Sequence, residues 1–167
     1  MSDHATRILD HPQIAQKLRR MAYQIFEHHQ DEKELVIVAV ERKGRMLAER
    51  ILPLLEEVAD FKITQVNLKI NKKQPLETPM LYADGSVLEG KSVVLIDDVL
   101  NSGRTLMYAA RHILSWPVAA LSTVVLIDRK HRKFPIKADF VGLSLSTTLQ
   151  DHIDVVFEPG NDNAYLA

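Results

Sequence analysis

Three short apolar stretches without a charged residue constrain the fold of this chain most strongly. They are Leu35–Val40, Val93–Ile96 and Leu121–Ile127. Strands that are covered on both faces have this pattern, whereas a half-exposed strand alternates polar and apolar residues. Helical periodicity separates the stretches, and the chain of 167 residues has the length of one domain. The sequence therefore predicts an α/β fold in a single domain, 1–167, with a mainly parallel sheet flanked by helices.

The expected elements follow from periodicity and from turn residues. Helical spacing of apolar residues predicts helices over 11–29, 46–58 and 103–115, with Pro53 kinking or restarting the second. Strands are expected at 35–40, 61–68, 93–96, 121–127, 140–143 and 153–157. Residues 69–92 are mostly polar, with a weak hairpin signal at 80–87, and a connection of this length in a compact domain is functional or mobile.

Composition excludes several classes of protein. The chain has 21 Lys and Arg against 22 Asp and Glu, a formal charge of −1, and 46% hydrophobic residues. It is thus neither disordered nor polybasic overall. The absence of cysteine excludes disulfides, thiolate metal sites and a cysteine nucleophile. Because no signal-peptide layout and no long uncharged apolar segment occur, we expect a soluble, cytoplasmic protein without a membrane partner.

One phosphate-binding pattern occurs in the wrong context. Gly85–Ser92 satisfies the sequence G-x-x-x-x-G-K-[ST] of a P-loop. A P-loop requires a helix after its Ser or Thr, so that backbone N–H groups point at the phosphates. The predicted strand 93–96 follows instead. A surface turn before a strand is therefore the preferred interpretation.

The segment after the strand at 93–96 carries the stronger signal. Asp97 and Asp98 end the strand, and a loop of small polar residues, Asn101–Thr105, then opens a helix. Open α/β sheets bind ligands at this edge, and the amides and hydroxyls of such a loop suit a phosphate. The two carboxylates suit hydroxyl groups or a hydrated Mg²⁺, so the pair of features points to a sugar phosphate.

Two other interpretations of this segment remain open at this point. Solvated aspartates and an ordinary helix cap would give the same residues without any ligand. A phosphoacceptor receiver domain also has an acidic pair at a strand end, but there the pair follows the first strand, whereas here it lies at residues 97 and 98.

The segment Val93–Thr105 closely resembles the motif that binds 5-phosphoribosyl 1-diphosphate (PRPP) in type I phosphoribosyltransferases. The resemblance continues in register at Val38–Gly44, where that family has its pyrophosphate loop, and at Ile127–Gly142, where it builds the hood over the base. Within the family, Asp-Asp-Val-Leu-x-Ser-Gly-Arg-Thr and Asp-Arg-x-His-Arg-x-x-Pro-Ile are similar to the pyrimidine-operon attenuators that have uracil phosphoribosyltransferase activity. The similarity covers most of residues 8–165.

The resemblance implies a role for each matching position. Asp97 and Asp98 would bind the ribose hydroxyls of PRPP, directly or through Mg²⁺. The 5′-phosphate would be held by Asn101, Ser102, Gly103, Arg104 and Thr105. The diphosphate would be held by Arg42, Lys43 and Gly44, and the base by Arg129, Phe140 and Val141. Catalysis would rest on Asp97, Asp98, Arg42 and Lys43, with a hood at about 128–143 and a mobile loop at about 69–90. The alternative to base binding for residues 129–133 is a solvated basic turn without a functional role.

The sequence departs from the family pattern at three places. Asn101 stands where purine-specific members have an aspartate and where uracil-specific relatives commonly have tyrosine. Lys43 replaces an arginine, and the loop near residues 68–73 lacks the expected arginine, for which Lys69, Lys72 or Lys73 could substitute. The acceptor base is therefore open, with uracil favoured over a purine.

The resemblance also implies partners. The expected ligands are PRPP, a nucleobase and Mg²⁺, and the expected assembly is a homodimer or homotetramer. A leader RNA is a further candidate partner, with or without catalysis. Because the net charge is −1, RNA binding would depend on a local patch such as Lys17, Arg19 and Arg20.

Overall fold

A six-stranded sheet forms the centre of the computed structural model, which describes residues 5–148 and 150–167. The strand order is β4-β3-β2-β5-β6-β7, and every neighbouring pair is parallel except β3 and β4. The strands are β2 (Glu34–Val40), β3 (Lys62–Lys69), β4 (Met80–Leu81), β5 (Ser92–Leu100), β6 (Ala120–Asp128) and β7 (Phe140–Ser144). The predicted α/β architecture with a mainly parallel sheet is confirmed.

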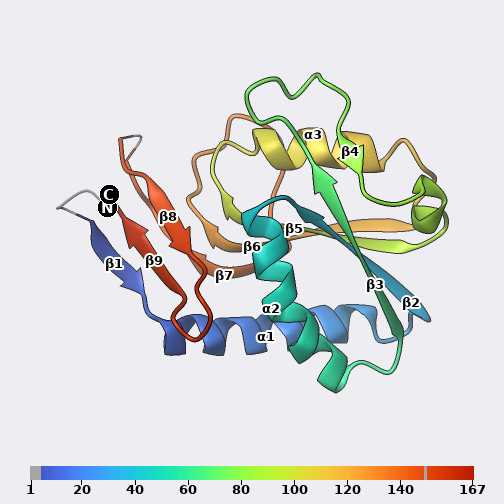
Figure 1. Ribbon diagram of the computed structural model, residues 1–167, viewed down its shortest axis with the longest axis horizontal. Helices are drawn as coiled ribbons and strands as arrows, with labels where there is room; N and C mark the ends of the chain where they lie inside the picture. Colours follow the sequence, from blue (N-terminus) through green and yellow to red (C-terminus); the bar gives the residue numbers. More distant parts are fainter. Residues whose placement is uncertain (1–4, 149) are drawn as a thin grey trace.

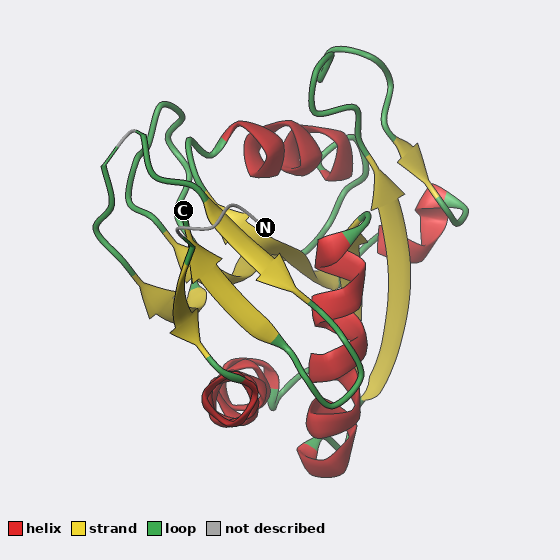
Figure 2. Ribbon diagram, turned by 60° about the vertical axis from the view of Figure 1, so that its left-hand side comes forward, coloured by secondary structure: helices red, strands yellow, loops and turns green. Residues whose placement is uncertain are grey.

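Helices cover both faces of this sheet (Figures 1 and 2). On one face lie α1 (His11–His29) and α2 (Lys43–Val58), and on the other lies α3 (Arg104–Ile113). The two faces of β2 explain its unbroken apolar sequence. Leu35, Ile37 and Ala39 pack with α1 and α2, while Val36, Val38 and Val40 pack with α3. A strand buried on both sides therefore has apolar residues at successive positions.

Local signals account for the helix boundaries. Asp10 and Gln13 form a reciprocal capping box at the start of α1, with N···O distances of 2.9 and 3.0 Å. Pro53 lies inside α2, which remains one helix from Lys43 to Val58. The expected restart at this proline is therefore wrong. None of the helices in residues 5–148 and 150–167 is both long and apolar enough to cross a membrane.

A second, antiparallel sheet lies beside the central one and brings the two ends of the described chain together (Figure 1). Its order is β1 (Thr6–Leu9), β9 (Asn163–Leu166) and β8 (Ile153–Val156). Asp162 anchors it to the helices: its carboxylate accepts from Arg50 Nε at 2.6 Å, and its N–H donates to His11 Nδ1 at 3.0 Å. Only the β8 strand was predicted.

The location predicted for the hood, 128–143, has to be corrected. Phe140–Ser144 is the edge strand of the central sheet, paired in parallel with β6. The part that stands apart from the central sheet is instead the β1-β9-β8 sheet. The sequence could not show this, because β1 and β9 lie more than 150 residues apart and β1 is a strand through its pairing with β9.

The stretch predicted to be a loop over 69–90 contains regular structure. Residues 70–79 are irregular, but β4 pairs with β3, and the short 3₁₀ helix η1 (Gly85–Leu88) buries Leu88. The P-loop interpretation is excluded, because β5 begins at Ser92, whose hydroxyl donates to Glu32 at 2.6 Å.

Candidate functional site

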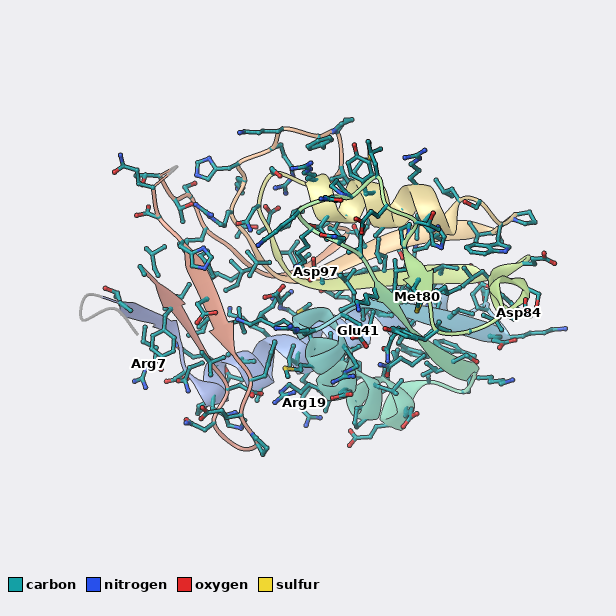
Figure 3. The ribbon with its side chains drawn as sticks, turned by 45° about the horizontal axis from the view of Figure 1, so that its top comes forward. Arg7, Arg19, Glu41, Met80, Asp84 and Asp97 are labelled. Carbon is teal, nitrogen blue, oxygen red and sulfur yellow. The ribbon has the colours of Figure 1, made fainter. Side chains whose placement is uncertain are left out.

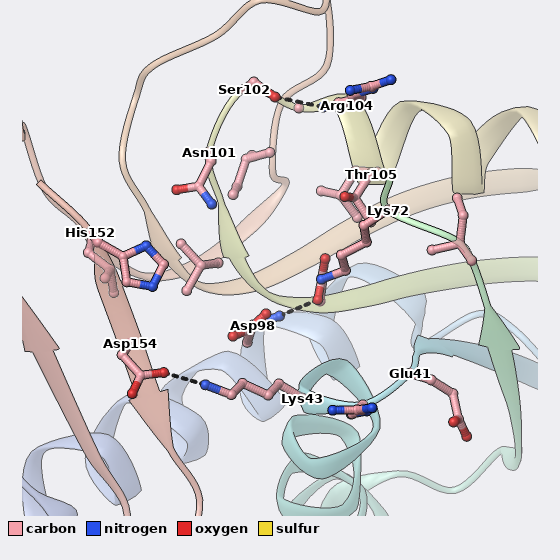
Figure 4. A pocket seen from close by; sticks show the side chains of 18 of the residues that line it. Glu41, Lys43, Lys72, Asp98, Asn101, Ser102, Arg104, Thr105, His152 and Asp154 are labelled. Atoms are coloured by element: carbon pink, nitrogen blue, oxygen red, sulfur yellow. Dashed lines mark hydrogen bonds and ion pairs between the residues drawn. The ribbon is translucent and has the colours of Figure 1, made fainter. Parts of the chain in front are cut away.

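One cavity of about 650 Å³ opens at the carboxyl edge of the central sheet (Figure 4), and two residues that line it, Glu41 and Asp97, are labelled in Figure 3. Its walls come from the β2–α2 turn, the end of β3, the end of β5 with the start of α3, and β8. The lining residues are Glu41, Arg42, Lys43, Lys69, Ile70, Lys72, Asp97, Asp98, Val99, Leu100, Asn101, Ser102, Gly103, Arg104, Thr105, Leu106, His152, Ile153 and Asp154. Segments that are far apart in sequence thus meet around one space.

The two adjacent carboxylates of β5, Asp97 and Asp98, are both buried and line the cavity. Asp97 is 2% exposed, and its Oδ1 accepts from the N–H of Asp98 at 2.9 Å. Burial, and then the charge of Asp98, raises the pKa of Asp97 well above its usual range, while Lys72 opposes this shift. Asp97 thus favours its protonated form unless a cation reaches it.

This donor set fits one kind of metal site. Within the described residues, no cluster of three or more His, Cys, Asp or Glu side chains could hold a metal ion. Mg²⁺ commonly binds through one or two carboxylates together with substrate phosphates and water. The pair Asp97 and Asp98 beside an anion-binding loop therefore fits Mg²⁺ that arrives with a phosphorylated substrate, rather than a closed protein cage.

The loop after β5 is shaped by Gly103, which is the N-cap of α3. Its φ of +89° is in the left-handed region, and a Cβ there would lie 2.6 Å from Ile136 Cγ2. Ser102 Oγ accepts from the N–H of Arg104 at 3.3 Å. The loop brings the N-terminus of α3 to the cavity, where its free N–H groups and dipole favour an anion.

A buried arginine braces this loop from behind. Arg129 is 8% exposed, and its guanidinium donates to Asn101 Oδ1 at 3.0 Å. It also donates to Thr147 Oγ1 at 3.0 Å, to the Thr148 carbonyl at 3.0 Å and to the Asp151 carbonyl at 2.5 Å. Arg129 therefore links the loop after β5 to the segment that leads into β8.

Arg132 adds a second brace to the same loop. It donates to the Asn101 carbonyl at 2.9 Å and to Asp128 Oδ1 at 2.6 Å. Because Arg129 only donates, Asn101 faces it with its side-chain oxygen. The basic run 129–133 is thus not simply a solvated turn.

The three residues predicted to hold the base do not line the cavity. The guanidinium of Arg129 is engaged in the hydrogen bonds described above. Phe140 and Val141 lie at the first two positions of β7, in register with Val124 and Val125 of β6 and, across β6, with Ile96 and Asp97 of β5. Phe140 packs against His28 of α1 instead, with ring centroids 5.7 Å apart.

The predicted diphosphate residues divide into two kinds. Arg42 and Lys43 line the cavity just after the peptide bond between Glu41 and Arg42, which is cis. Gly44 is buried outside the lining, and a Cβ there would lie 2.7 Å from the Ile96 carbonyl oxygen. Gly44 therefore allows close packing of α2 on β5 and does not face the cavity.

Sequence reasoning missed the wall that β8 contributes. His152, Ile153 and Asp154 line the cavity, and Lys43 Nζ contacts Asp154 Oδ1 at 2.5 Å. The strand itself was predicted from its apolar residues, but nothing in the sequence indicates that it returns to this edge. Lys69 and Lys72, considered as substitutes for a missing arginine, do line the cavity, whereas Lys73 does not.

Comparison with known proteins identifies the class to which this fold and site belong. Residues 4–162 match the phosphoribosyl transferase domain, and the chain belongs to that family. The expected type I phosphoribosyltransferase fold is confirmed by the hypoxanthine phosphoribosyltransferase of Trypanosoma cruzi complexed with IMP. That structure has a TM-score of 0.77 and 21% identity, covering 88% of this chain and 75% of that chain.

Within the family, the chain is similar to proteins named "Bifunctional protein PyrR". The protein of that name from Streptomyces coelicolor is 34% identical, with 97% of this chain and 89% of the relative covered. The one from Haemophilus ducreyi is 32% identical, with 89% of this chain and 87% of the relative covered. The predicted resemblance is therefore confirmed over most of the chain.

Proposed function

We propose that this protein transfers the 5-phosphoribosyl group of PRPP to a nucleobase, with uracil favoured, and that it also acts as a pyrimidine-responsive RNA-binding regulator. One observation carries the proposal. The two carboxylates Asp97 and Asp98, the loop 101–105 at the start of α3 and the cations Arg42 and Lys43 face the same cavity. This is the set of groups that a ribose, a phosphate monoester and a diphosphate require.

The geometry supports a role for each group in this reaction. Asp97 and Asp98 accept from the ribose hydroxyls or hold Mg²⁺, which neutralises charge on the diphosphate when it is bound. Backbone N–H groups of Ser102–Thr105 and the hydroxyls of Ser102 and Thr105 surround the 5′-phosphate. Asn101 contributes its amide NH₂ group at the edge of this loop.

The chemistry then needs little from the protein beyond binding and charge stabilisation. The bond between C1 of the ribose and the diphosphate oxygen breaks, and the electron pair leaves with diphosphate. A ring nitrogen of the base attacks C1 from the opposite face and loses its N–H proton to solvent. Arg42 and Lys43 stabilise the negative charge that collects on the leaving group, with Lys69 and Lys72 facing the same space. Enclosure of the reaction limits hydrolysis by water.

The acceptor base is tested by a substrate panel. The amide of Asn101 cannot act as an acid or base, which argues against an enzyme for hypoxanthine or guanine. The protein is incubated with PRPP, Mg²⁺ and uracil, adenine, guanine, hypoxanthine, xanthine or orotate, and diphosphate release is followed. We expect the fastest release with uracil. Release only with purines would overturn the uracil assignment, and PRPP binding without release from any base would favour the alternative, a non-catalytic nucleotide-sensing regulator.

The patch predicted for RNA binding, Lys17, Arg19 and Arg20, makes some contacts within the subunit. In the proposed patch, Arg20 donates to the carbonyls of Val141 and Gly142 at 3.1 and 2.7 Å, and Arg19 lies 3.7 Å from Glu57. These two arginines therefore already contact acceptor groups within the subunit. A gel shift with the organism's own pyrimidine leader RNA tests the proposal: we expect salt-dependent binding that UMP strengthens. No binding at low salt with UMP present would refute this part of the function.

We also propose a homodimer or homotetramer, since the type I family that the sequence resembles usually assembles in this way. Sedimentation equilibrium over a range of protein concentrations measures the assembly state directly. A monomer at micromolar concentration would contradict the assignment.

A further inference from the structure

An ion pair spans the cavity between two layers of the fold. Lys43 is the first residue of α2, whereas Asp154 is in β8 of the small sheet, and their Nζ and Oδ1 atoms are 2.5 Å apart. Both side chains line the cavity and are about half exposed, at 41% and 50%. Figure 4 shows the contact reaching across the lower part of the cavity, below Asp98. A ligand that enters this part of the site meets a cation that already has a counterion.

The charge of Asp154 matters because the site must attract a polyanion. A diphosphate group that contacts Lys43 would have its oxygens within a few ångström of the Asp154 carboxylate. Two like charges about 4 Å apart repel by about 4 kcal/mol at the effective dielectric constant of a protein surface. Because the Asp154 side chain is half exposed, water can solvate its carboxylate once a ligand binds Lys43. The diphosphate and the carboxylate therefore compete for one ammonium group.

We propose that Asp154 is the internal counterion of Lys43 and that the diphosphate group of the ligand replaces it. The pairing lowers the affinity of the free site for diphosphate and holds β8 against α2 until a ligand binds. Asp154 is thus a positioning residue that acts through Lys43. The inference rests on the proposed function, because that function assigns the diphosphate to Arg42 and Lys43.

The test is a direct binding measurement that needs no nucleobase. Isothermal titration calorimetry with Mg²⁺ and diphosphate compares the wild type with Asp154→Asn, which keeps the size of the side chain but removes its charge. We expect the variant to bind diphosphate up to about fivefold more tightly, the range of a partly exposed ion pair. Asp154→Ala should shift the affinity in the same direction. In steady-state assays, the KM for PRPP should fall more than kcat changes.

Two further variants separate the ion pair from general electrostatics. Glu56→Gln makes the same change of charge on the exposed part of α2 and should leave the diphosphate Kd unchanged. In a Lys43→Ala background, Asp154→Asn should no longer tighten binding. Thermal unfolding of each variant checks that it is folded.

The outcomes distinguish this inference from the function on which it rests. If the wild type does not bind Mg²⁺-diphosphate, the proposed function fails, and the counterion role fails with it. If the wild type binds but Asp154→Asn and Asp154→Ala bind equally or more weakly, only the counterion role is refuted. A gain of the same size without Lys43 would also refute it.

Discussion

The cavity has two walls that are built on different physical principles. We call residues 97–105 the loop wall and the four cations Arg42, Lys43, Lys69 and Lys72 the cation wall. The loop wall is held by hydrogen bonds from the buried Arg129 and from Arg132 to neutral acceptors and one carboxylate. The cation wall consists of long side chains, and its one ion pair with β8 is half exposed.

This difference shows how one site can combine a preorganised loop wall with an adjustable cation wall. Buried hydrogen bonds keep a fixed geometry because breaking them leaves unpaired polar groups in the protein interior. Half-exposed ion pairs exchange partners easily, because water and salt compensate for their loss. A phosphate monoester that stays on the sugar suits the loop wall, and a diphosphate that must leave suits the cation wall.

The largest expected effect is on catalysis and involves one residue of each wall. Asp98→Asn and Lys43→Ala should each lower kcat/KM at least a hundredfold, since removing one preorganised contact raises the barrier by about 2.7–4 kcal/mol. Initial rates of diphosphate release with PRPP and uracil measure this effect, with Glu56→Gln as the control. Near-normal activity of Asp98→Asn would show that this residue of the loop wall is not needed for catalysis, and near-normal activity of Lys43→Ala would show the same for the cation wall.

Next comes a contrast in stability between the walls. Arg129→Met should lower the free energy of unfolding by about 2–4 kcal/mol, because buried acceptors that lose their donor cost about 1–3 kcal/mol each. Lys43→Met, which removes the half-exposed pair with Asp154, should lower it by less than about 1 kcal/mol. Urea denaturation of both variants measures the difference. Equal losses would mean that the two walls are not held differently.

Gly103 allows a finer test of the loop wall. An alanine there must adopt a left-handed conformation and also meets Ile136, so Gly103→Ala should cost about 1–3 kcal/mol of stability. Gly90 is a matched control, because its φ is +70° but a Cβ would have nothing within 4 Å. We expect Gly90→Ala to be the milder change in thermal unfolding. If both variants lose the same stability, packing against Ile136 has no part in shaping the loop.

The smallest expected effect is a pH dependence of the protein's stability that arises from Asp97 on the cavity floor. The pKa of Asp97 is raised in the folded protein by burial and by Asp98, above its value in the unfolded chain. Its contribution to stability is therefore complete below about pH 4, the unfolded pKa, and is lost as the pH rises toward the folded pKa. The slope is at most about 1.4 kcal/mol per pH unit.

Asp97→Asn should flatten this part of the profile, which urea denaturation between pH 4 and pH 8 without divalent cations measures. Mg²⁺ with PRPP should restore stability at the higher pH in the wild type but not in the variant. A wild-type profile that is flat or rises over this range would contradict the burial effect.

Sequence reasoning predicted the parts of the site that are contiguous in the chain. Asp97, Asp98 and Asn101–Thr105 follow one another at the end of a buried strand, so local pattern was enough to bring them to one edge of the sheet. Arg42 and Lys43 follow the neighbouring strand and were assigned through the resemblance to the family's pyrophosphate loop. Phe140 and Val141 were assigned to the base through the family resemblance and do not line the cavity, because which residues of a strand reach a site depends on how the whole strand packs.

The sequence by itself determined the α/β order, the buried strands and the acidic pair with its loop, because these depend on periodicity and on neighbours within a few residues. Only the tertiary structure decided that Arg129 turns inward, that β1, β8 and β9 form a second sheet, and that Asp154 contacts Lys43 across 111 residues. Those contacts depend on the relative placement of distant segments, which packing of the whole core sets. The charge that a ligand meets in this cavity is therefore a property of the fold and not of any one motif.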